Sequence, residues 1–206
     1  ARLDGRAFHS FTKGLKRPYD KGFSALMQSV LIDLVTETDA CIGYTQSDEI
    51  SLVFREPTPE SQIFFDGRVQ KMTSILAAMC SVKFNKEIAR FLPDSHHDKV
   101  GMFDCRVWSV PNRSEATNVL LWREWDATKN SISMAAQSVY SHKSLQNKNG
   151  KQVQEMLMEK GINWNDYPTF FKRGVYVQRR KVLRRFTAEE LEKLPEKHDE
   201  SLVTID

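Results

Sequence analysis

The chain has 206 residues, of which 40% are hydrophobic and 28% are charged, and its formal net charge is only +3. This length and composition indicate a globular chain with a real core, built as one large domain or as one domain with a substantial extension. No apolar run approaches the roughly 18 residues that cross a bilayer and no signal-peptide pattern is present, so we expect a cytoplasmic protein without a membrane partner.

The N-terminal residues 1–4 read as the middle of a strand, so we expect residues upstream of Ala1 and missing loop residues elsewhere in the numbering. Asp4-Gly5-Arg6 turns out of this strand, and the glycine permits a close approach of the backbone to a ligand. Basic residues crowd the region around Asp4, namely Arg2, Arg6, Lys13, Lys16, Arg17 and Lys21.

Residues 23–35 predict an amphipathic helix, because apolar side chains recur there at i, i+3 and i+4. Two short strands are expected next, at residues 41–44 and 50–54. The polar break between them carries two adjacent carboxylates, Asp48 and Glu49. Acidic pairs at strand ends commonly hold a divalent metal against a phosphate, and a solvated hairpin tip is the alternative interpretation.

A second long helix is expected after a loop marked by Pro57 and Pro59. Arg68 and Lys71 lie one turn apart near its start and can point the same way, although an ordinary surface pair is also consistent with that spacing. The apolar face of this helix is expected to contain Val69, Met72, Leu76, Met79 and Cys80.

A polar loop with His96 and His97 follows, and a further strand is expected within residues 102–111. Two adjacent histidines could hold a metal ion, but no third ligand accompanies them in the pattern. We therefore expect both imidazoles to be exposed to solvent.

The order of these elements is strand, helix, strand, strand, helix, strand, which is the ferredoxin-like or split βαβ arrangement. In that topology the third strand lies between the first and the second and runs antiparallel to both. The end of the first strand then adjoins the start of the third, which brings Asp4 next to Asp48. The topology therefore favours a metal site over a polar turn.

The second half of the chain is predicted to be mainly helical, with helices at residues 112–125 and 152–160, the latter ending at Gly161, and one helix or a helix pair at residues 126–142. Residues 170–180 predict a strand in which aromatic and basic side chains alternate. Such a strand can stack bases and bind phosphates, which makes Lys172, Arg173, Arg179 and Arg180 candidate RNA-binding residues. Core aromatics beside solvated charges explain the same pattern equally well.

Charge is unevenly distributed in this half. Residues 143–185 contain eleven Lys and Arg against three Asp and Glu, whereas residues 186–206 contain two Lys against seven acidic residues. A basic stretch beside an acidic tail favours a polyanion partner, and a lysine-rich solvated surface is the alternative. The capping box at residues 187–190 predicts a final short helix. The three widely spaced cysteines, in apolar contexts, are expected to be buried free thiols: Cys41, Cys80 and Cys105.

The sequence contains no glycine-rich Walker loop, no GxSxG elbow and no CxxC pair. Site chemistry must therefore rest on carboxylates, metal ions and basic residues. That set fits nucleotidyl transfer, in which two divalent ions held by two Asp carboxylates activate a hydroxyl and stabilise the leaving phosphate. Basic side chains would neutralise the triphosphate.

Several short segments stand out along the chain. They are residues 2–11 (RLDGRAFHSF), 17–20 (RPYD), 43–49 (GYTQSDE), 67–71 (GRVQK), 103–106 (FDCR), 163–165 (NWN) and 172–174 (KRG). Together and in this order they resemble the tRNA-His guanylyltransferase family, and the resemblance covers nearly the whole chain. The resemblance implies a polymerase-like palm that adds nucleotides to the 5′ end of RNA, opposite to the ordinary direction, with Mg²⁺, ATP and GTP.

The resemblance also implies roles for individual residues. Asp4, Asp48 and Glu49 would be catalytic, and two Mg²⁺ ions would be bound by Asp4, Asp48 and the carbonyl of Gly5, with Glu49 supporting the metal site. Nucleoside triphosphates would contact Asp4, Gly5, Arg6, Ala7, Phe8, His9, Arg17, Ser47, Asp48, Arg68, Lys71 and Asn130.

One segment departs from the eukaryotic tRNA-His enzymes. Their His-Ile-Asn-Asn-Leu-Tyr-Asn motif is replaced at residues 126–134 by DATKNSISM. This departure favours the bacterial and archaeal guanylyltransferase-like branch, which extends truncated tRNA by templated pairing. The resemblance further implies a homotetramer, a dimer of dimers.

We thus predict an α+β protein with a palm core at residues 1–111 and a mainly helical extension at residues 112–206 for RNA binding and oligomerisation. Three alternatives stay open. They are untemplated addition of G to tRNA-His, a non-catalytic tRNA-binding module, and a nucleotide cyclase-like enzyme.

Overall fold

The computed structural model describes residues 1–55, 62–180, 182–187, 189 and 202–205. The loop predicted at Pro57 and Pro59, and most of the short helix predicted after Thr187, lie outside the described residues. In the described part of the chain, no helix is long and apolar enough to cross a membrane. In chain order, the elements are β1 (Arg2–Gly5), α1 (Phe8–Phe11), α2 (Lys21–Thr38), β2 (Ile42–Gln46), β3 (Glu49–Val53), η1 (Phe64–Gly67), α3 (Val69–Phe91), η2 (Asp94–His96), β4 (Phe103–Arg106), α4 (Arg113–Gln137), α5 (His142–Leu145), α6 (Gly150–Glu159), η3 (Trp164–Asp166), α7 (Thr169–Arg173), β5 (Val175–Gln178), β6 (Val182–Arg185) and β7 (Leu202–Ile205).

The main sheet has five strands in the order β4-β1-β3-β2-β5, and every neighbouring pair is antiparallel. Its first four strands have the ferredoxin-like order, so the predicted fold class is confirmed. Because β3 lies between β1 and β2, Asp4 at the end of β1 pairs with Glu49 at the start of β3.

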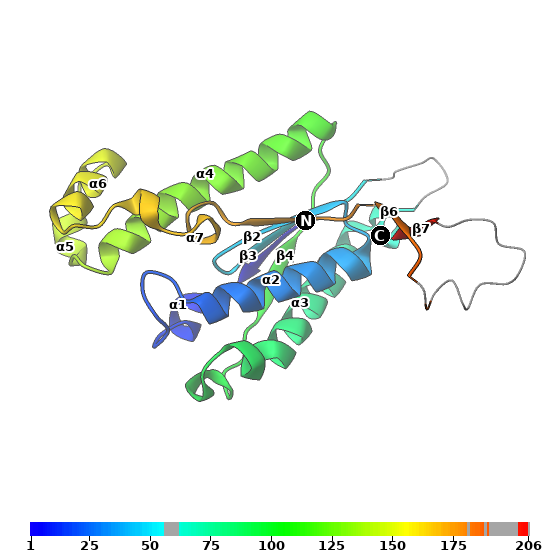
Figure 1. The fold of residues 1–206 in the computed structure, drawn as a ribbon, viewed down its shortest axis with the longest axis horizontal. Coiled ribbons are helices and arrows are strands. Elements are labelled where there is room, and N and C mark those ends of the chain that lie inside the picture. The colour runs from blue at the N-terminus through cyan, green and yellow to red at the C-terminus, as the bar shows by residue number, and fades with distance from the viewer. Residues whose placement is uncertain (56–61, 181, 188, 190–201, 206) are drawn as a thin grey trace, which may run out of the picture.

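Helices cover both faces of this sheet (Figure 1), with α2 and α3 on one face and α4 on the other. The predicted apolar stripe of α2 is buried throughout, and α3 buries every fourth residue between Met72 and Ile88. Each large apolar side chain buried in this way contributes about 1.5–3 kcal/mol. Val69 is 50% exposed at the first position of α3, so its predicted place in the core is wrong. Cys80 and Cys105 are buried free thiols, as predicted, whereas Cys41 is only partly buried.

One continuous helix, α4, replaces the separate helices predicted at residues 112–142. The Asn112 side chain caps its start by accepting from the Glu115 N–H at 2.9 Å. Residues 113–137 contain neither glycine nor proline, so nothing in the sequence interrupts the backbone hydrogen bonds across the expected boundary. The later helix α6 is followed by Gly161 at φ 72°, as its predicted end requires.

The strand predicted at residues 170–180 is wrong in its first half, which forms the short helix α7. Pro168 precedes α7, and Gly174 ends it at φ 80° and ψ −168°, a conformation that is essentially restricted to glycine. Only then does β5 begin, and it pairs with β2 at the edge of the main sheet. The extension therefore contributes a strand to the core sheet, and the predicted boundary at residue 111 stays a prediction.

Gly174→Ala is expected to destabilise the protein by roughly 2 kcal/mol. Its Cβ would lie 2.6 Å from the Thr45 carbonyl oxygen and from the Tyr44 ring, and the positive φ would be strained. Gly150→Ala is the matched control, because no atom lies within 4 Å of the added Cβ. Thermal unfolding followed by circular dichroism measures both variants, and equal melting temperatures would contradict the expectation.

Candidate active site

A polar cavity of about 330 Å³ lies at the end of the main sheet where β1 finishes and β3 begins. Asp4, Asp48 and Glu49 line it from the sheet, and Asn130 lines it from α4. The structure thus brings Asp4 and Asp48 to one cavity although 43 residues separate them in the sequence. We call it the carboxylate cavity.

The turn before β3 holds Asp48 in place by local hydrogen bonds. The Gly5 N–H donates to the Asp48 carbonyl oxygen at 3.0 Å and so joins the ends of β1 and the β2–β3 turn. Ser47 adopts φ 54°, a conformation that few non-glycine residues take. Its hydroxyl donates to Asp48 Oδ1 at 3.1 Å, which orients the carboxylate.

Negative charge is concentrated around Asp48. Burial raises the pKa of its carboxyl group, and the charges of Asp4 and Glu49 raise it further, against the hydrogen bonds from its own backbone and from Ser47. Among the described residues, Asp48 forms no ion pair. A bound cation would therefore relieve the repulsion between these carboxylates.

The donor set of this cavity fits Mg²⁺. Mg²⁺ is commonly bound by one or two carboxylates together with substrate phosphates rather than by a closed protein cage. In the described part of the chain, no group of three or more His, Cys, Asp or Glu could hold a metal ion by itself. The roles of Asp4, Asp48 and the Gly5 carbonyl as metal ligands stay a prediction.

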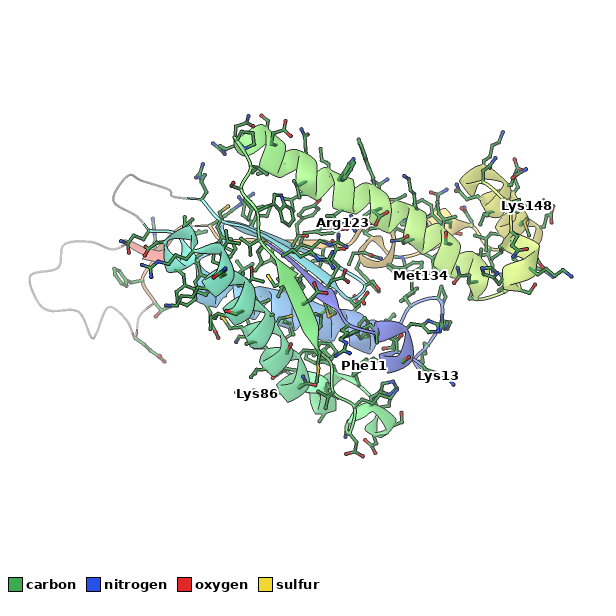
Figure 2. All side chains as sticks on the ribbon, turned by 180° about the vertical axis from the view of Figure 1, so that it is seen from behind. Phe11, Lys13, Lys86, Arg123, Met134 and Lys148 are labelled. Atoms are coloured by element: carbon green, nitrogen blue, oxygen red, sulfur yellow. The ribbon has the colours of Figure 1, made fainter. Side chains whose placement is uncertain are left out.

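Glu49 is buried and carries two arginine partners. Arg123 of α4 donates to its two carboxylate oxygens at 2.6 and 2.8 Å, and Arg2 Nη2 lies 2.7 Å from Glu49 Oε2. Arg2 also approaches Asp4 Oδ2 at 3.4 Å, while Arg123 donates to Asp126 at 2.9 Å. Figure 2 labels Arg123 on the side of α4 that faces the sheet. Glu49 therefore joins α4 to the carboxylate cavity.

Sequence reasoning missed Arg123 and Asp126 as members of this site. Periodicity groups Arg123 and Asp126 with the predicted Asn130, because the three stand at i, i+3 and i+7 and so share one face of a helix. It does not show that this face lies over Glu49. Asn130 Nδ2 lies 3.5 Å from Asp126 Oδ2, and all three residues line the carboxylate cavity.

A second cavity, of about 110 Å³, adjoins the first and shares Gln46, Ser47 and Met134 with it. Arg17 lines it, as do the loop before α2 and the face of α7. Its aromatic lining consists of Tyr19, Phe23, Phe170 and Phe171. Flat rings such as nucleobases stack well on surfaces of this kind. We call it the aromatic cavity.

The predicted nucleotide-binding residues that follow β1 differ in their exposure to solvent. Arg6, Ala7 and His9 are exposed, and Ala7 adopts φ 57° at the start of α1. The Phe8 side chain is only 4% exposed and packs against Phe103 with ring centroids 4.9 Å apart. It therefore belongs to the core, and only its backbone is available to a ligand.

Arg68 and Lys71 are not brought to the carboxylate cavity. They lie at the start of α3, which follows the far end of β3, whereas Asp48 precedes the near end. Arg68 pairs with Asp66 at 3.1 Å, and the Lys71 ammonium lies 4.5 Å from the centre of the Phe65 ring. Their contact with a triphosphate stays a prediction, because the fold of a single chain does not bring them to this cavity.

The four candidate RNA-binding residues all have partners within the chain. Arg173 pairs with Glu124 at 3.2 Å, Lys172 donates to the Asn165 carbonyl at 2.5 Å, Arg179 pairs with Asp39, and Arg180 donates to Gln178. Part of the positive charge counted in the sequence is thus compensated internally. Their role with RNA stays a prediction, as does the homotetramer.

His96 is 1% exposed, so its predicted place in solvent is wrong, whereas His97 is exposed as expected. The loop that carries His96 folds back onto α1, and the imidazole packs edge-on against the Phe11 ring at 5.8 Å. The polar residues around it in the sequence gave no sign of this burial.

The chain is similar to known proteins of one family. A family model described as tRNAHis guanylyltransferase matches residues 1–111. A bacterial tRNA(His) guanylyltransferase-like protein in complex with ATP is 39% identical, with a TM-score of 0.80 over 86% of this chain and 77% of that one. A similar bacterial protein in complex with GTP is 33% identical, with a TM-score of 0.71 over 91% and 76%. The tRNA(His) guanylyltransferase of Saccharomyces cerevisiae is 27% identical over 87% of this chain and 81% of its own length.

Proposed function

The chain belongs to the tRNAHis guanylyltransferase family of nucleotidyltransferases, and from this premise we propose that it extends the 5′ ends of tRNA in the 3′-to-5′ direction by templated, Mg²⁺-dependent repair. The substrates are a tRNA that lacks its first nucleotide, ATP and a nucleoside triphosphate that pairs with the opposing base. The departure at residues 126–134 from the tRNA-His motif supports templated repair over untemplated addition of G.

The reaction has two nucleotidyl transfers. The 5′ phosphate of the RNA first attacks the α-phosphorus of ATP, which releases pyrophosphate and leaves an adenylylated end. The 3′-hydroxyl of the incoming nucleotide then attacks the RNA phosphorus, and AMP leaves. Asp4 and Asp48 would hold Mg²⁺, which would lower the pKa of the attacking hydroxyl and neutralise charge on the transferring phosphate.

The residues of this chain divide the remaining work. Asp4 and Asp48 provide the negative charge that holds the cation, and Ser47 orients Asp48. Arg2 and Arg123 neutralise Glu49, which limits the repulsion that phosphates would meet at this wall. The aromatic cavity takes the base of a nucleotide, and Arg17 at its edge lies within reach of phosphates leading to the carboxylate cavity.

One observation carries the proposal. The carboxylate cavity and the aromatic cavity share Ser47, Gln46 and Met134, so a single nucleotide can place its base in one and its phosphates in the other. A generic metal site would not require an aromatic cavity at its side.

The protein is expected to add the nucleotide that pairs with the opposing base when incubated with tRNA lacking its first nucleotide, all four triphosphates and Mg²⁺. Base pairing selects the nucleotide in templated addition, so changing the opposing base should change the added one. End-labelled RNA resolved at single-nucleotide resolution measures the product, and omission of ATP is the control for activation of the 5′ end.

The other outcomes separate the alternatives. Addition of G whatever the opposing base would support the tRNA-His role. Metal-dependent triphosphate chemistry without any need for tRNA would favour a cyclase-like enzyme. Binding of tRNA without metal-dependent triphosphate binding would favour a non-catalytic module, and the proposal would then be wrong.

A further inference from the structure

Lys99, in the connection between α3 and β4, contacts the end of α1 and the loop that follows it. The Lys99 ammonium donates to the Phe11 carbonyl at 2.7 Å and to the Lys13 carbonyl at 3.2 Å, and it lies 3.0 Å from His96 Nε2. Figure 2 labels Phe11 and Lys13 at α1 and in the loop that follows it. An ammonium has three N–H donors, so all three are engaged here. We call Lys99 and His96 the clasp.

The clasp requires a neutral imidazole. Lys99 can only donate, so His96 Nε2 must accept, and the ring proton then sits on Nδ1. Nδ1 lies 3.1 Å from the Ser95 hydroxyl, which can accept that proton. The ring is almost wholly buried, so water cannot replace either contact.

The other end of the same loop is fastened as well. Asp20 Oδ2 accepts from the Lys16 N–H at 3.3 Å, while Oδ1 caps α2 by accepting from the Phe23 N–H at 2.9 Å. Between these two anchors, Thr12, Leu15 and Lys16 form one wall of the aromatic cavity. The position of that wall therefore depends on the clasp at one end and on Asp20 at the other.

We infer that Lys99 and His96 are positioning residues for the nucleotide, and that nucleotide affinity depends on His96 staying neutral. The inference rests on the proposed function, because it takes the aromatic cavity as the seat of a nucleotide base. Neither residue lines the carboxylate cavity or the aromatic cavity. Lys99 acts through the backbone carbonyls of the loop, and His96 acts through Lys99.

The expected pH dependence follows from the groups around His96. Burial lowers the pKa of its imidazole, the Lys99 charge lowers it further and His97 adds to this, whereas a backbone contact with Phe11 and the charge of Asp20 raise it. A histidine whose pKa is lowered when the clasp is formed favours the formed clasp above the ordinary pKa of 6.5. Affinity should therefore be full above that pH and fall as the pH drops below it.

ATP binding by isothermal titration calorimetry, on the full chain with Mg²⁺, tests the lysine. Lys99→Met is expected to bind ATP about tenfold more weakly, because the Phe11 and Lys13 carbonyls lose their shared donor. Lys99→Arg should recover most of the affinity by restoring charge and donors. Lys86→Met, an exposed lysine on α3, is the matched control and should bind like the wild type.

His96→Gln tests the pH dependence, because a glutamine oxygen can accept from Lys99 at every pH. Wild-type affinity is expected to fall about tenfold more than that of His96→Gln between pH 7.5 and pH 5. Titration of the nucleotide phosphates and of Asp48 is common to both proteins and cancels in this ratio.

The outcomes distinguish the two proposals. A wild-type protein that binds no ATP would refute the proposed function. ATP binding by the wild type with equal affinity in Lys99→Met, or with the same pH profile in His96→Gln, would refute the clasp alone.

Discussion

Asp48→Asn is expected to slow nucleotide addition by about a thousandfold or more, while the protein without Mg²⁺ melts at a higher temperature than the wild type. The amide cannot replace the carboxylate as a ligand of comparable charge, so the metal-dependent step is lost. The same change removes a partly buried negative charge that is repelled by Asp4 and Glu49, so the metal-free fold gains stability.

The pH dependence of that gain gives a second test. The pKa of Asp48 is raised in the folded state, so its contribution to stability is present below the ordinary value near 3.8 and is lost as the pH rises through the raised pKa. The stabilisation by Asp48→Asn should therefore be largest at neutral pH and vanish in acid. Added Mg²⁺ should raise the melting temperature of the wild type and leave the variant unchanged.

Asp166→Asn is the matched control, since Asp166 is an exposed carboxylate on η3. It should leave nucleotide addition, metal-free stability and the response to Mg²⁺ as they are in the wild type. Wild-type rates in Asp48→Asn at saturating Mg²⁺ would remove Asp48 from the metal site.

Arg123→Met is expected to destabilise the protein by about 3 kcal/mol, with a fall in melting temperature of roughly 10 °C. Its guanidinium forms a bidentate pair with Glu49, and the two side chains are only 18% and 12% exposed. Without Arg123, the Glu49 carboxylate keeps Arg2 as its one ion-pair partner among the described residues, and it lines the same cavity as Asp4 and Asp48. The rate of nucleotide addition should also fall, because the carboxylate cavity loses a positive charge that lines it.

A double-mutant cycle separates the pair from the general loss of a long side chain. Glu49→Gln combined with Arg123→Met should be less destabilised than the sum of the single variants, since the stranded charge is gone. Arg113→Met, on the exposed first turn of α4, controls for loss of an arginine from this helix. Additive effects in the cycle would mean that Glu49 and Arg123 do not stabilise one another.

The parts of the site that the sequence predicted are those that follow from strand order. The proximity of Asp4 and Asp48 could be predicted because split βαβ topology places the end of β1 beside the start of β3, independently of the loop sequences. The stripe of α2 was equally predictable, because periodicity alone decides which face is buried.

The parts that could not be predicted depend on tertiary contacts. Arg123 reaches Glu49 only because α4 crosses the sheet in one orientation, and periodicity carries no information about crossing. In the sequence, His96 has the surroundings of a solvated loop residue. Its burial depends on its tertiary contacts with Lys99 and Phe11. The start of β5 was misplaced because Gly174 ends a short helix before the strand, and local propensity does not separate these two states over five residues.

The connection of α4 to Glu49 has a mechanical consequence. A helix of 25 residues is a rod about 37 Å long. Arg123 attaches this rod to the sheet partway along its length, while its far end carries α5 and α6 beyond the sheet (Figure 1). Glu124, the next residue, also joins the rod to the sheet, because it accepts from the Tyr176 hydroxyl of β5 at 3.1 Å. A displacement of the rod at this point would move the Arg123 guanidinium relative to Glu49, at the wall of the carboxylate cavity.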